Sequence, residues 1–387
     1  MRRRRLLVVG PLPPPVGGVE TVTKAVLESR LKEEWQLAHC NLTKGRAKTT
    51  QGKFDLGNFV WAAIHFSRML RSVAAFRPHA VYMAVTATWS GFLRDSVIAW
   101  IAKAGGAKVV GHVHGGWFDR ILARTGRSGR IVRASLRHFD ALLVLGTKWR
   151  DDVDRYGFEG RCMIVPSTFR QELADAASPF RRNYAVREPK GLFVGQIGQA
   201  KGVMDLLHAL NDLRVAGTAI KLTLVGPGQF GDDLERAHAL VKELALEDLV
   251  TFTGQLQGDA LYEQYRKADF LVLPSHFEGL PVVFFEAGAF GLPVIGTPVG
   301  AIPDLLKHGE NALLVQPRDI AGLAAALRRL HDSADERRRL GTKLMHDIQP
   351  YTPAAVCSEI GEAVRLVLEA PGGESWEKQF SARRLKL

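Results

Sequence analysis

The sequence predicts an α/β protein made of two doubly wound halves, each with a parallel sheet covered by helices. Three observations support this fold class. Short apolar strands alternate with helical stretches from Leu6 to Leu145, and the same alternation restarts at Gly191. A chain of 387 residues is also too long for one ordinary core. We therefore expect two Rossmann-like domains that face each other across a central cleft.

The first half is expected to contain four strands and three helices. Its strands are short and apolar, and the stretch from Phe59 to Phe76 carries apolar residues at the three-and-four spacing of a helix. The expected strands are Leu6 to Gly10, Ala80 to Ala84, Lys108 to Val113 and Ala141 to Leu145; the expected helices are Glu20 to Leu31, Phe59 to Phe76 and Gly91 to Lys103. The polar segment from Thr43 to Phe54 is typical of a loop.

The second half repeats the alternation with shorter elements. Its expected strands are Gly191 to Val194, Lys221 to Val225, Val250 to Phe252, Phe270 to Leu273 and Pro293 to Gly296; its expected helices are Gly202 to Val215, Leu234 to Leu244, Leu261 to Lys267 and a helix that begins near Pro281 and ends at Gly291. The joint between the halves falls in the charged segment from Pro166 to Pro189.

These patterns predict a division of the chain into four parts. Residues 1–170 form the first domain and residues 171–350 the second. Residues 351–370 include a helical stretch that we expect to pack back on the first domain, and residues 371–387 are Gly-rich, then charged, and typical of a mobile tail.

Composition narrows the class of protein. No apolar run approaches the roughly 20 residues of a membrane-spanning helix. The start MRRRRLLVVG is predicted to be a first strand, because its apolar run is short and ends in Gly10-Pro11. Three distant cysteines, Cys40, Cys162 and Cys357, indicate neither a disulfide framework nor a zinc site. We therefore expect a cytoplasmic protein.

A formal charge of +12 calls for an explanation. Between Trp117 and Arg137, six arginines face a single Asp119 and are interleaved with apolar residues. Such a segment suits the anionic inner face of a cell membrane, and it equally suits a solvated basic face. Both interpretations stay open. Nucleic acid is not an expected partner, because no recognisable binding module accompanies the charge.

The stretch from Ala268 to Gln316 holds the main candidate site. A strand is followed by a loop with Glu278, then by Gly279-Leu280-Pro281 and a helix that contains Glu286. This is a βαβ unit, and open parallel sheets bind ligands beyond the carboxyl ends of their strands. A lone glutamate in a helix as apolar as VVFFEAGAF also needs a partner.

The start of that helix offers backbone donors between the two glutamates. The N–H groups of Val282 and Val283, together with that of Leu280, are free to bind phosphate beside Pro281. One loop can thus offer a carboxylate to sugar hydroxyls, amides to a diphosphate and a second carboxylate to a ribose. Two solvated glutamates on a surface helix are the simpler alternative.

Three further loops follow strands. The segment Gly195 to Gly202 contains Gln196 and Lys201, and the lysine is suited to neutralise a diphosphate, although a surface lysine is an ordinary alternative. Gly17-Gly18 permits a close backbone approach to a ligand.

The third loop follows the strand that ends in His112-Val113-His114. The two histidines share one face of that strand, and His114 is better placed to face the cleft. A buried structural histidine remains the alternative for His112. A metal pair lacks a third ligand with suitable spacing.

Two motifs are considered decoys. Gly226 to Gly231 matches the dinucleotide pattern G-x-G-x-x-G, but it lies in the second βα unit of its half and contains Pro227. Asp152-Val153-Asp154 matches a metal-binding D-x-D, but its surroundings predict a charged, solvated helix.

With these residues in place, the chain resembles the retaining GT-B glycosyltransferases of family 4, also called glycosyl transferases group 1. The similarity reaches about residue 370 and is strongest from Gly191 to Leu330. It rests on Glu278, seven residues and Glu286, followed by Ala287-Gly-Ala289-Phe-Gly291-Leu-Pro293-Val-Ile295 and the segment TPVGAIPDLLKHGENALLV.

The resemblance implies transfer of a sugar from a nucleoside diphosphate sugar, with UDP or GDP as carrier, to a glycan or lipid-linked acceptor in polysaccharide or glycolipid synthesis. It implies retention of anomeric configuration and no metal or other cofactor. The implied roles are Glu278 for the donor sugar, Glu286 for the ribose, His114 near the reacting centre, and Gly18, Lys201 and the amides from Leu280 to Val283 near the diphosphate.

One position departs from the family pattern. The family usually has arginine directly after the glycine that ends the first strand of the second domain, and here that residue is Gln196. One cation fewer at the diphosphate is the motive for one alternative, a non-catalytic GT-B protein that binds nucleotide or glycan. A GT-B sugar-nucleotide epimerase is the alternative among enzymes. The donor sugar, its base, the acceptor and the oligomeric state are not encoded in any motif.

Overall fold

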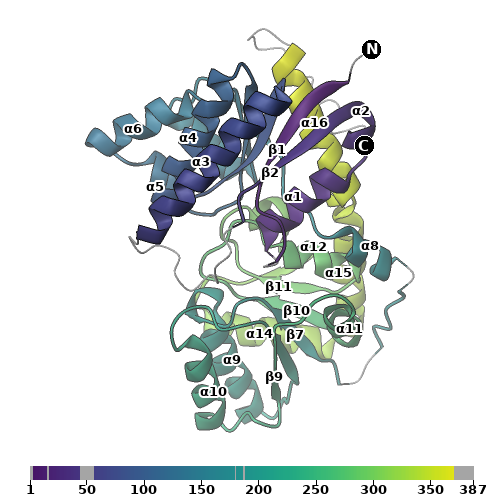
Figure 1. Cartoon of the computed structure of the whole chain (residues 1–387). Helices are drawn as coiled ribbons and strands as arrows, with labels where there is room; N and C mark the ends of the chain where they lie inside the picture. Colours follow the sequence, from purple (N-terminus) through teal and green to yellow (C-terminus); the bar gives the residue numbers. More distant parts are fainter. Residues whose placement is uncertain (1–2, 15–16, 44–55, 179, 186–187, 370–387) are drawn as a thin grey trace. The chain divides into compact units, whose positions relative to one another are not determined.

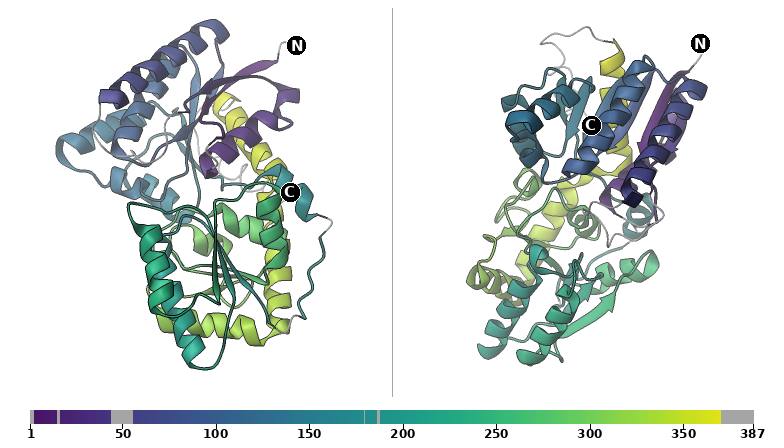
Figure 2. Two further views of the ribbon diagram at one scale, coloured as in Figure 1. Left: turned by 60° about the horizontal axis from the view of Figure 1, so that its bottom comes forward. Right: turned by 60° about the vertical axis from the view of Figure 1, so that its left-hand side comes forward.

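The computed structural model describes residues 3–14, 17–43, 56–178, 180–185 and 188–369. The chain divides into two compact units, Met1–Arg170 with Pro350–Leu387, and Gln171–Gln349. Each unit contains a parallel six-stranded sheet (Figure 1), and Figure 2 shows helices along both faces of each sheet. The predicted α/β class with two Rossmann-like domains is therefore confirmed. Most of the expected loop Thr43–Phe54 and the tail 371–387 lie outside the described residues.

The sheet of the first unit has the strand order β2-β1-β3-β4-β5-β6, and every pair is parallel. Its strands are β1 (Arg4–Gly10), β2 (Trp35–Asn41), β3 (Ala80–Val85), β4 (Lys108–Val113), β5 (Ala141–Val144) and β6 (Arg161–Ile164). The direction of winding reverses between β1 and β3, where open sheets place their ligands. The loop with Gly18 follows β1.

The helices of this unit are α1 (Gly18–Glu28), α2 (Leu31–Glu34), α3 (Leu56–Phe76), α4 (Trp89–Ala104), α5 (Phe118–Leu122), α6 (Gly126–Leu136), α7 (Thr147–Arg155) and α16 (Pro353–Glu369). The single helix expected over Glu20–Leu31 is wrong in its extent. The chain breaks at Ser29, whose hydroxyl donates to the carbonyl of Val26 and accepts from the N–H of Leu31.

Two strands of this sheet escaped prediction. β2 is an edge strand that follows a one-turn helix directly, and it buries only Trp35 and Cys40 fully, so its apolar pattern is weak. β6 has four residues and begins with Arg161. Both strands form because a neighbouring strand provides backbone hydrogen-bond partners, and the pattern of a single sequence does not contain that information.

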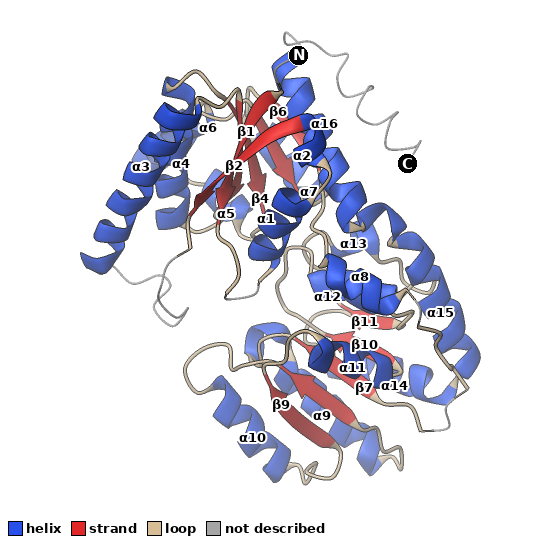
Figure 3. Ribbon diagram, turned by 45° about the vertical axis from the view of Figure 1, so that its right-hand side comes forward, coloured by secondary structure: helices blue, strands red, loops and turns tan. Residues whose placement is uncertain are grey.

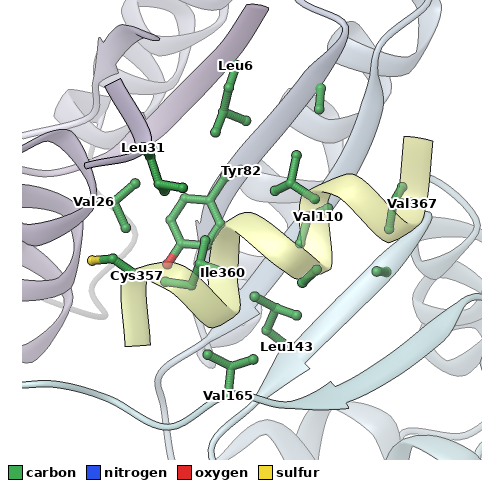
Figure 4. Close-up of a cluster of buried hydrophobic side chains, with 14 of the residues drawn as sticks. Leu6, Val26, Leu31, Tyr82, Val110, Leu143, Val165, Cys357, Ile360 and Val367 are labelled. Atoms are coloured by element: carbon green, nitrogen blue, oxygen red, sulfur yellow. The ribbon is translucent and has the colours of Figure 1, made fainter. Parts of the chain in front are cut away.

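Helix α16 completes the core of the first unit. Its residues Val356, Ile360 and Val364 belong to one buried cluster with residues of β1, β3, β4 and β5. Figure 4 shows the helix with Tyr82 and Val110 beside it. A segment that is remote in sequence thus covers one face of the first sheet.

The sheet of the second unit has the order β12-β11-β10-β7-β8-β9 and is also parallel (Figure 3). Its strands are β7 (Gly191–Val194), β8 (Leu222–Val225), β9 (Val250–Gly254), β10 (Phe270–Leu273), β11 (Val294–Gly296) and β12 (Leu313–Leu314). The direction of winding reverses between β7 and β10. The loops after these two neighbouring strands therefore meet at the ligand-binding edge.

The helical elements of the second unit are α8 (Gln171–Ala177), η2 (Gln199–Lys201), α9 (Val203–Val215), α10 (Asp233–Glu243), α11 (Asp259–Lys267), α12 (Val282–Ala289), α13 (Ile302–Leu305), α14 (Ile320–Asp332), α15 (Ala334–Asp347) and η3 (Gln349–Tyr351), whose last two residues lie past the boundary. Among the described residues of the whole chain, no helix is both long enough and apolar enough to cross a membrane.

Candidate functional site

The loop between β10 and α12 is the centre of the candidate site. Strand β10 is fully buried, and α12 starts at Val282 with Pro281 in an extended conformation immediately before it. The helix expected to begin near Pro281 therefore begins one residue later, with Pro281 as its N-cap. Gly291 ends the helix as expected: it has φ +66°, and its N–H donates to the carbonyl of Gly288 over 2.9 Å.

The start of α12 presents backbone donors. No side chain caps the helix, and the N–H of Phe284 is already bound to the carbonyl of Pro281 at 3.2 Å. The N–H groups of Val282 and Val283 precede it and have no partner within the helix. Leu280 and Pro281 are buried, whereas Val282 and Val283 are half-buried. The helix start can therefore receive an anion.

Glu278 forms the polar centre of this loop. Its Oε1 lies 2.5 Å from Nζ of Lys201 and accepts a hydrogen bond of 2.8 Å from the hydroxyl of Ser275. The side chain of Glu278 is only 9% exposed. The interpretation of Glu278 and Lys201 as unrelated surface residues is therefore wrong, because a carboxylate this buried is stabilised by its cation and hydroxyl.

A tight backbone contact holds the Glu278 loop in place. Gly300 has φ +62°, and a Cβ on it would lie 2.3 Å from the carbonyl oxygen of Glu278. The next residue, Ala301, donates its N–H to the carbonyl of Gly279 at 3.0 Å. The loop after β11 thus packs directly on the loop that carries Glu278, and only glycine allows that approach.

Lys201 is positioned by a second tight contact. Gly202, which follows it, has φ +70°, and a Cβ there would lie 2.0 Å from the carbonyl oxygen of Pro274. The N–H of His276 donates to the carbonyl of Ala200 at 2.9 Å. The loops after β7 and β10 are therefore joined through their backbones, and this junction brings Lys201 to Glu278.

Three polar residues at this junction were not predicted from the sequence: Ser275, His276 and Asp205. Nε2 of His276 lies 2.6 Å from Oδ2 of Asp205, in the first turn of α9. Ser275 and His276 come directly after β10, so their place beyond the carboxyl end of a central strand was the available signal. Nothing in the local pattern indicates that Asp205 meets His276.

Glu286 lies deeper than Glu278. It is 5% exposed, and its Oε2 accepts a hydrogen bond of 2.6 Å from the hydroxyl of Tyr265 on α11. The Tyr265 ring stacks on Phe290 with centroids 5.5 Å apart. The predicted need for a partner is confirmed, and that partner was not identifiable from sequence. The ribose-binding role of Glu286 stays a prediction.

Gln196 lies in the loop after β7 and is half-buried. This loop is held by the G-x-G-x-x-G segment: the N–H of Ile197 donates to Pro227, and a Cβ on Gly226 would lie 1.8 Å from the carbonyl oxygen of Gly195. Gly226, with φ +145°, thus serves as structural support for the candidate site.

The first unit contains the other predicted site residues. Gly18 is exposed and begins α1, immediately after the N-cap Gly17. His114 follows β4, and within the described part of the chain its buried Nδ1 has no hydrogen-bond partner. Burial lowers the pKa of His114 well below its usual value, and His112 acts in the same direction. His114 is therefore neutral and keeps a nitrogen for a ligand.

His112 has a structural role. Its Nδ1 accepts a hydrogen bond of 2.8 Å from the hydroxyl of Tyr82, and its Nε2 donates to the carbonyl of Val165 over 2.9 Å. Its ring lies 4.0 Å from that of His114, so the two histidines share a face as predicted. With both nitrogens engaged, His112 has no lone pair for a metal.

Burial also distinguishes the alternatives for the basic segment and for the D-x-D motif. Of the large apolar residues from Trp117 to Arg137, Phe118, Ile121, Leu122, Val132 and Leu136 are buried, whereas Trp117, at 45%, and Ile131, at 46%, are exposed. The expectation of a solvated D-x-D face is wrong for Asp152, which is 8% exposed and lies within 3.4 Å of Lys148 and Arg155.

The chain has two Rossmann-like units, each with a parallel sheet, and a candidate anion site at a helix start. These features define it as a GT-B type protein. The model of the glycosyl transferases group 1 matches residues 177–344, and that of the glycosyl transferase 4-like domain matches residues 33–168. The chain belongs to the GT-B glycosyltransferases of the family 4 type.

Individual relatives agree with this assignment. A glycogen synthase of Mycobacterium tuberculosis is 31% identical over 259 residues, which cover 64% of this chain and 59% of that protein. The chain therefore spans less than two thirds of the length of this relative. A sucrose-phosphate synthase of Thermosynechococcus elongatus has a TM-score of 0.76 at 20% identity, covering 95% of this chain and 100% of that one. The Anabaena HepE structure with UDP and glucose has a TM-score of 0.69 at 15% identity, covering 94% and 100%.

Proposed function

We propose that this protein transfers a sugar from a nucleoside diphosphate sugar, with UDP or GDP as carrier, to a glycan or lipid-linked acceptor, with retention of anomeric configuration. The observation that carries the proposal is the pairing of Glu278 with Lys201 beside the open start of α12. On adjoining loops, the carboxylate suits the sugar of such a donor, and the cation and the free amides suit its diphosphate. The solved relative that contains UDP and glucose supports this choice of substrate.

In this proposal the donor occupies the second unit. Lys201 and the N–H groups of Val282 and Val283 hold the diphosphate, Glu278 contacts hydroxyls of the sugar, and Glu286 holds the ribose. Two of these roles require rearrangement. Lys201 must leave its ion pair with Glu278, and Glu286 must share its carboxylate between Tyr265 and the ribose.

The reaction breaks the bond between the anomeric carbon and the phosphate oxygen. The nucleoside diphosphate leaves with the electron pair, and the acceptor oxygen forms its bond on the same face of an oxocarbenium-like centre. The acceptor proton passes to the leaving phosphate. Positive charge from Lys201 and the α12 start stabilises the leaving group, a role that otherwise falls to a metal ion. In this proposal His114 serves the reacting centre and Gly18 serves the diphosphate.

The test is sugar transfer by the full chain with a panel of nucleotide sugars and acceptors. Glu278→Ala and Glu278→Gln should abolish turnover while the protein stays folded, and Glu247→Ala, an exposed change in the same unit, should leave it intact. Turnover near the normal rate in both Glu278 variants would reject the assignment. The anomeric configuration of the product, read by NMR, tests retention, and activity in a metal chelator tests metal independence.

A second candidate is a non-catalytic nucleotide-binding partner protein, and Gln196 is the observation that favours it. Calorimetry with UDP and GDP alongside a donor-hydrolysis assay separates the two. Tight binding without any turnover supports the partner protein, whereas turnover excludes it. An epimerase would instead convert the sugar nucleotide without an acceptor.

We also propose contact with an anionic membrane through the first unit. Helices α4 and α6 pack together; α4 exposes Trp100 (55%), and α6 exposes Ile131 (46%) together with its arginines. Vesicle flotation with and without an anionic lipid tests this, with Trp100→Ser as the variant. Equal flotation of both proteins on anionic vesicles would argue against the surface.

A further inference from the structure

The first unit contains a basic pocket remote from the candidate site. It has a volume of about 460 Å³ and lies at the amino ends of β4 and β6. Its polar lining includes Lys103, Lys108, Arg133, Arg137, Arg161 and Asp140. Lys108 begins β4 and His114 follows its end, so roughly 20 Å of strand separate this pocket from His114. It is therefore not part of the expected acceptor side.

The charges in this pocket are unbalanced. Five cationic side chains and two acidic ones, Asp140 and Glu159, line it, which leaves an excess of three positive charges. Asp140 is already engaged. Its carboxylate accepts from the N–H of Val109 at 2.8 Å and lies 3.2 Å from Lys108 and 3.5 Å from Lys103. Its single negative charge is thus shared between two lysines, and no ion pair joins it to Arg133 or Arg137 among the described residues.

Arg133 and Arg137 supply the recognition groups. Arg133 lies in the last turn of α6 and Arg137 is its C-cap residue. Because they are four positions apart, they lie on one face of the helix. Considering only described residues, the guanidinium groups of both make no hydrogen bond and no ion pair, and both side chains are exposed. A planar guanidinium binds phosphate oxygens through two parallel hydrogen bonds. Two such groups at one pocket rim are suited to a phosphate group.

The rest of the pocket gives it a floor and a link to the core. Phe139, Phe158 and Val367 provide apolar lining, and Arg161 donates to the carbonyl of Leu366 near the end of α16. A volume of about 460 Å³ falls in the range of sites for small molecules. An anion that binds here would hold α6, β6 and the end of α16 together.

We propose that this pocket binds a compact phosphate-bearing group, distinct from the donor diphosphate, with Arg133 and Arg137 as its main ligands. The group is either a free phosphorylated small molecule or the phosphate of a lipid headgroup. Both sources present the same oxygens to the same guanidinium forks. The binding would stabilise the first unit and raise its resistance to unfolding.

The test compares two double variants of the full chain with equal net charge. Arg133→Gln with Arg137→Gln removes the proposed ligands, and Arg127→Gln with Arg130→Gln removes two exposed arginines of α6 that do not line the pocket. Calorimetric titration with inorganic pyrophosphate should weaken at least tenfold in the first variant and less than twofold in the second. Lys201→Ala identifies any contribution of the donor site, because that change should leave pocket binding intact.

Two vesicle arms identify the source of the phosphate. Loss of pyrophosphate binding with the same flotation on phosphatidic acid vesicles as the control variant identifies a free ligand. Loss of pyrophosphate binding together with a clearly larger loss of flotation than in the control variant identifies a headgroup. Equal weakening in the two double variants, or no weakening in either, would overturn the proposal. Thermal unfolding of both variants checks that the fold is preserved.

Discussion

Nζ of Lys201 lies 2.5 Å from Oε1 of Glu278, across 77 positions of sequence. In the proposed reaction these two groups serve different parts of one donor, the cation for the diphosphate and the carboxylate for the sugar. Without ligand they neutralise each other in a largely buried setting. Donor binding therefore exchanges one ion pair for two separate interactions, and the strength of that pair affects donor affinity.

The two partners of this pair should respond differently to substitution. Lys201→Met should weaken UDP binding by roughly 10- to 100-fold, because a hydrogen bond to a charged group contributes about 1.5–3 kcal/mol. Glu278→Gln should leave UDP binding equal or tighter, since the ammonium is released, while sugar transfer is lost. Calorimetry with UDP measures both. Equal weakening in the two variants would show that the pair acts as one structural unit.

Gly202 should tolerate no side chain. Gly202→Ala adds a clash with the Pro274 carbonyl to the strain of φ +70°. Gly217→Ala is the matched control, because Gly217 has φ +82° and nothing within 4 Å of its added Cβ. Urea unfolding should show a loss of about 1 kcal/mol for the control and clearly more for Gly202→Ala. Equal losses would mean that the loop moves aside freely.

Tyr265 should be important for holding Glu286. Tyr265→Phe removes the hydroxyl that donates to the buried carboxylate. We expect a loss of about 1–3 kcal/mol in unfolding free energy. Urea unfolding measures it, and Tyr156→Phe at a half-buried position of the first unit is the control. No loss of stability in Tyr265→Phe would show that Glu286 is satisfied by other groups.

The stability of the first unit should fall in acid. Burial lowers the pKa of His112 to about 4, whereas an unfolded histidine has its usual value of 6.5. Between these pH values the unfolded chain binds a proton that the folded chain does not. The contribution of His112 to the free energy of unfolding is therefore full above pH 6.5, and about 3 kcal/mol of it is lost as the pH falls toward 4. The lowered pKa of His114 acts in the same direction.

Unfolding free energies of wild type and His112→Gln across this pH range provide the measurement. The variant should show a shallower decline, and His346→Gln, which changes an exposed histidine, should follow wild type. An NMR titration of the His112 ring checks the same point in the intact protein. A ring that titrates near 6.5 would contradict the expected burial effect.

Replacing Gln196 with arginine, the residue usual in the family, should change the affinity for UDP. Gln196→Arg places a guanidinium in the loop after β7, and we expect tighter UDP binding and faster transfer. Gln196→Lys and Gln196→Glu provide a charge series for the same assay. If UDP affinity is the same across the series, the loop does not reach the diphosphate.

Much of the fold and of the site chemistry was predictable from local patterns. Strands β4, β7 and β10 were placed at their observed bounds, since continuous apolar runs between turn residues are typical of buried parallel strands. Glu278 and the start of α12 were recognisable because their spacing is set within one βαβ unit. Edge strand β2, short β6 and two-residue β12 were missed, because their formation depends on a neighbouring strand rather than on their own residues.

The sequence by itself determined the α/β class, the restart of the alternation at Gly191 and the residue types of the candidate site. Tertiary structure alone decided the partners. Lys201 meets Glu278 because Gly202 packs on Pro274, and Tyr265 meets Glu286 across 21 positions of sequence. It also decided that His112 is structural and that most apolar residues of the basic segment face inward. The physical reason is that spacing along a chain sets local geometry, whereas burial and pairing depend on which remote segments pack together.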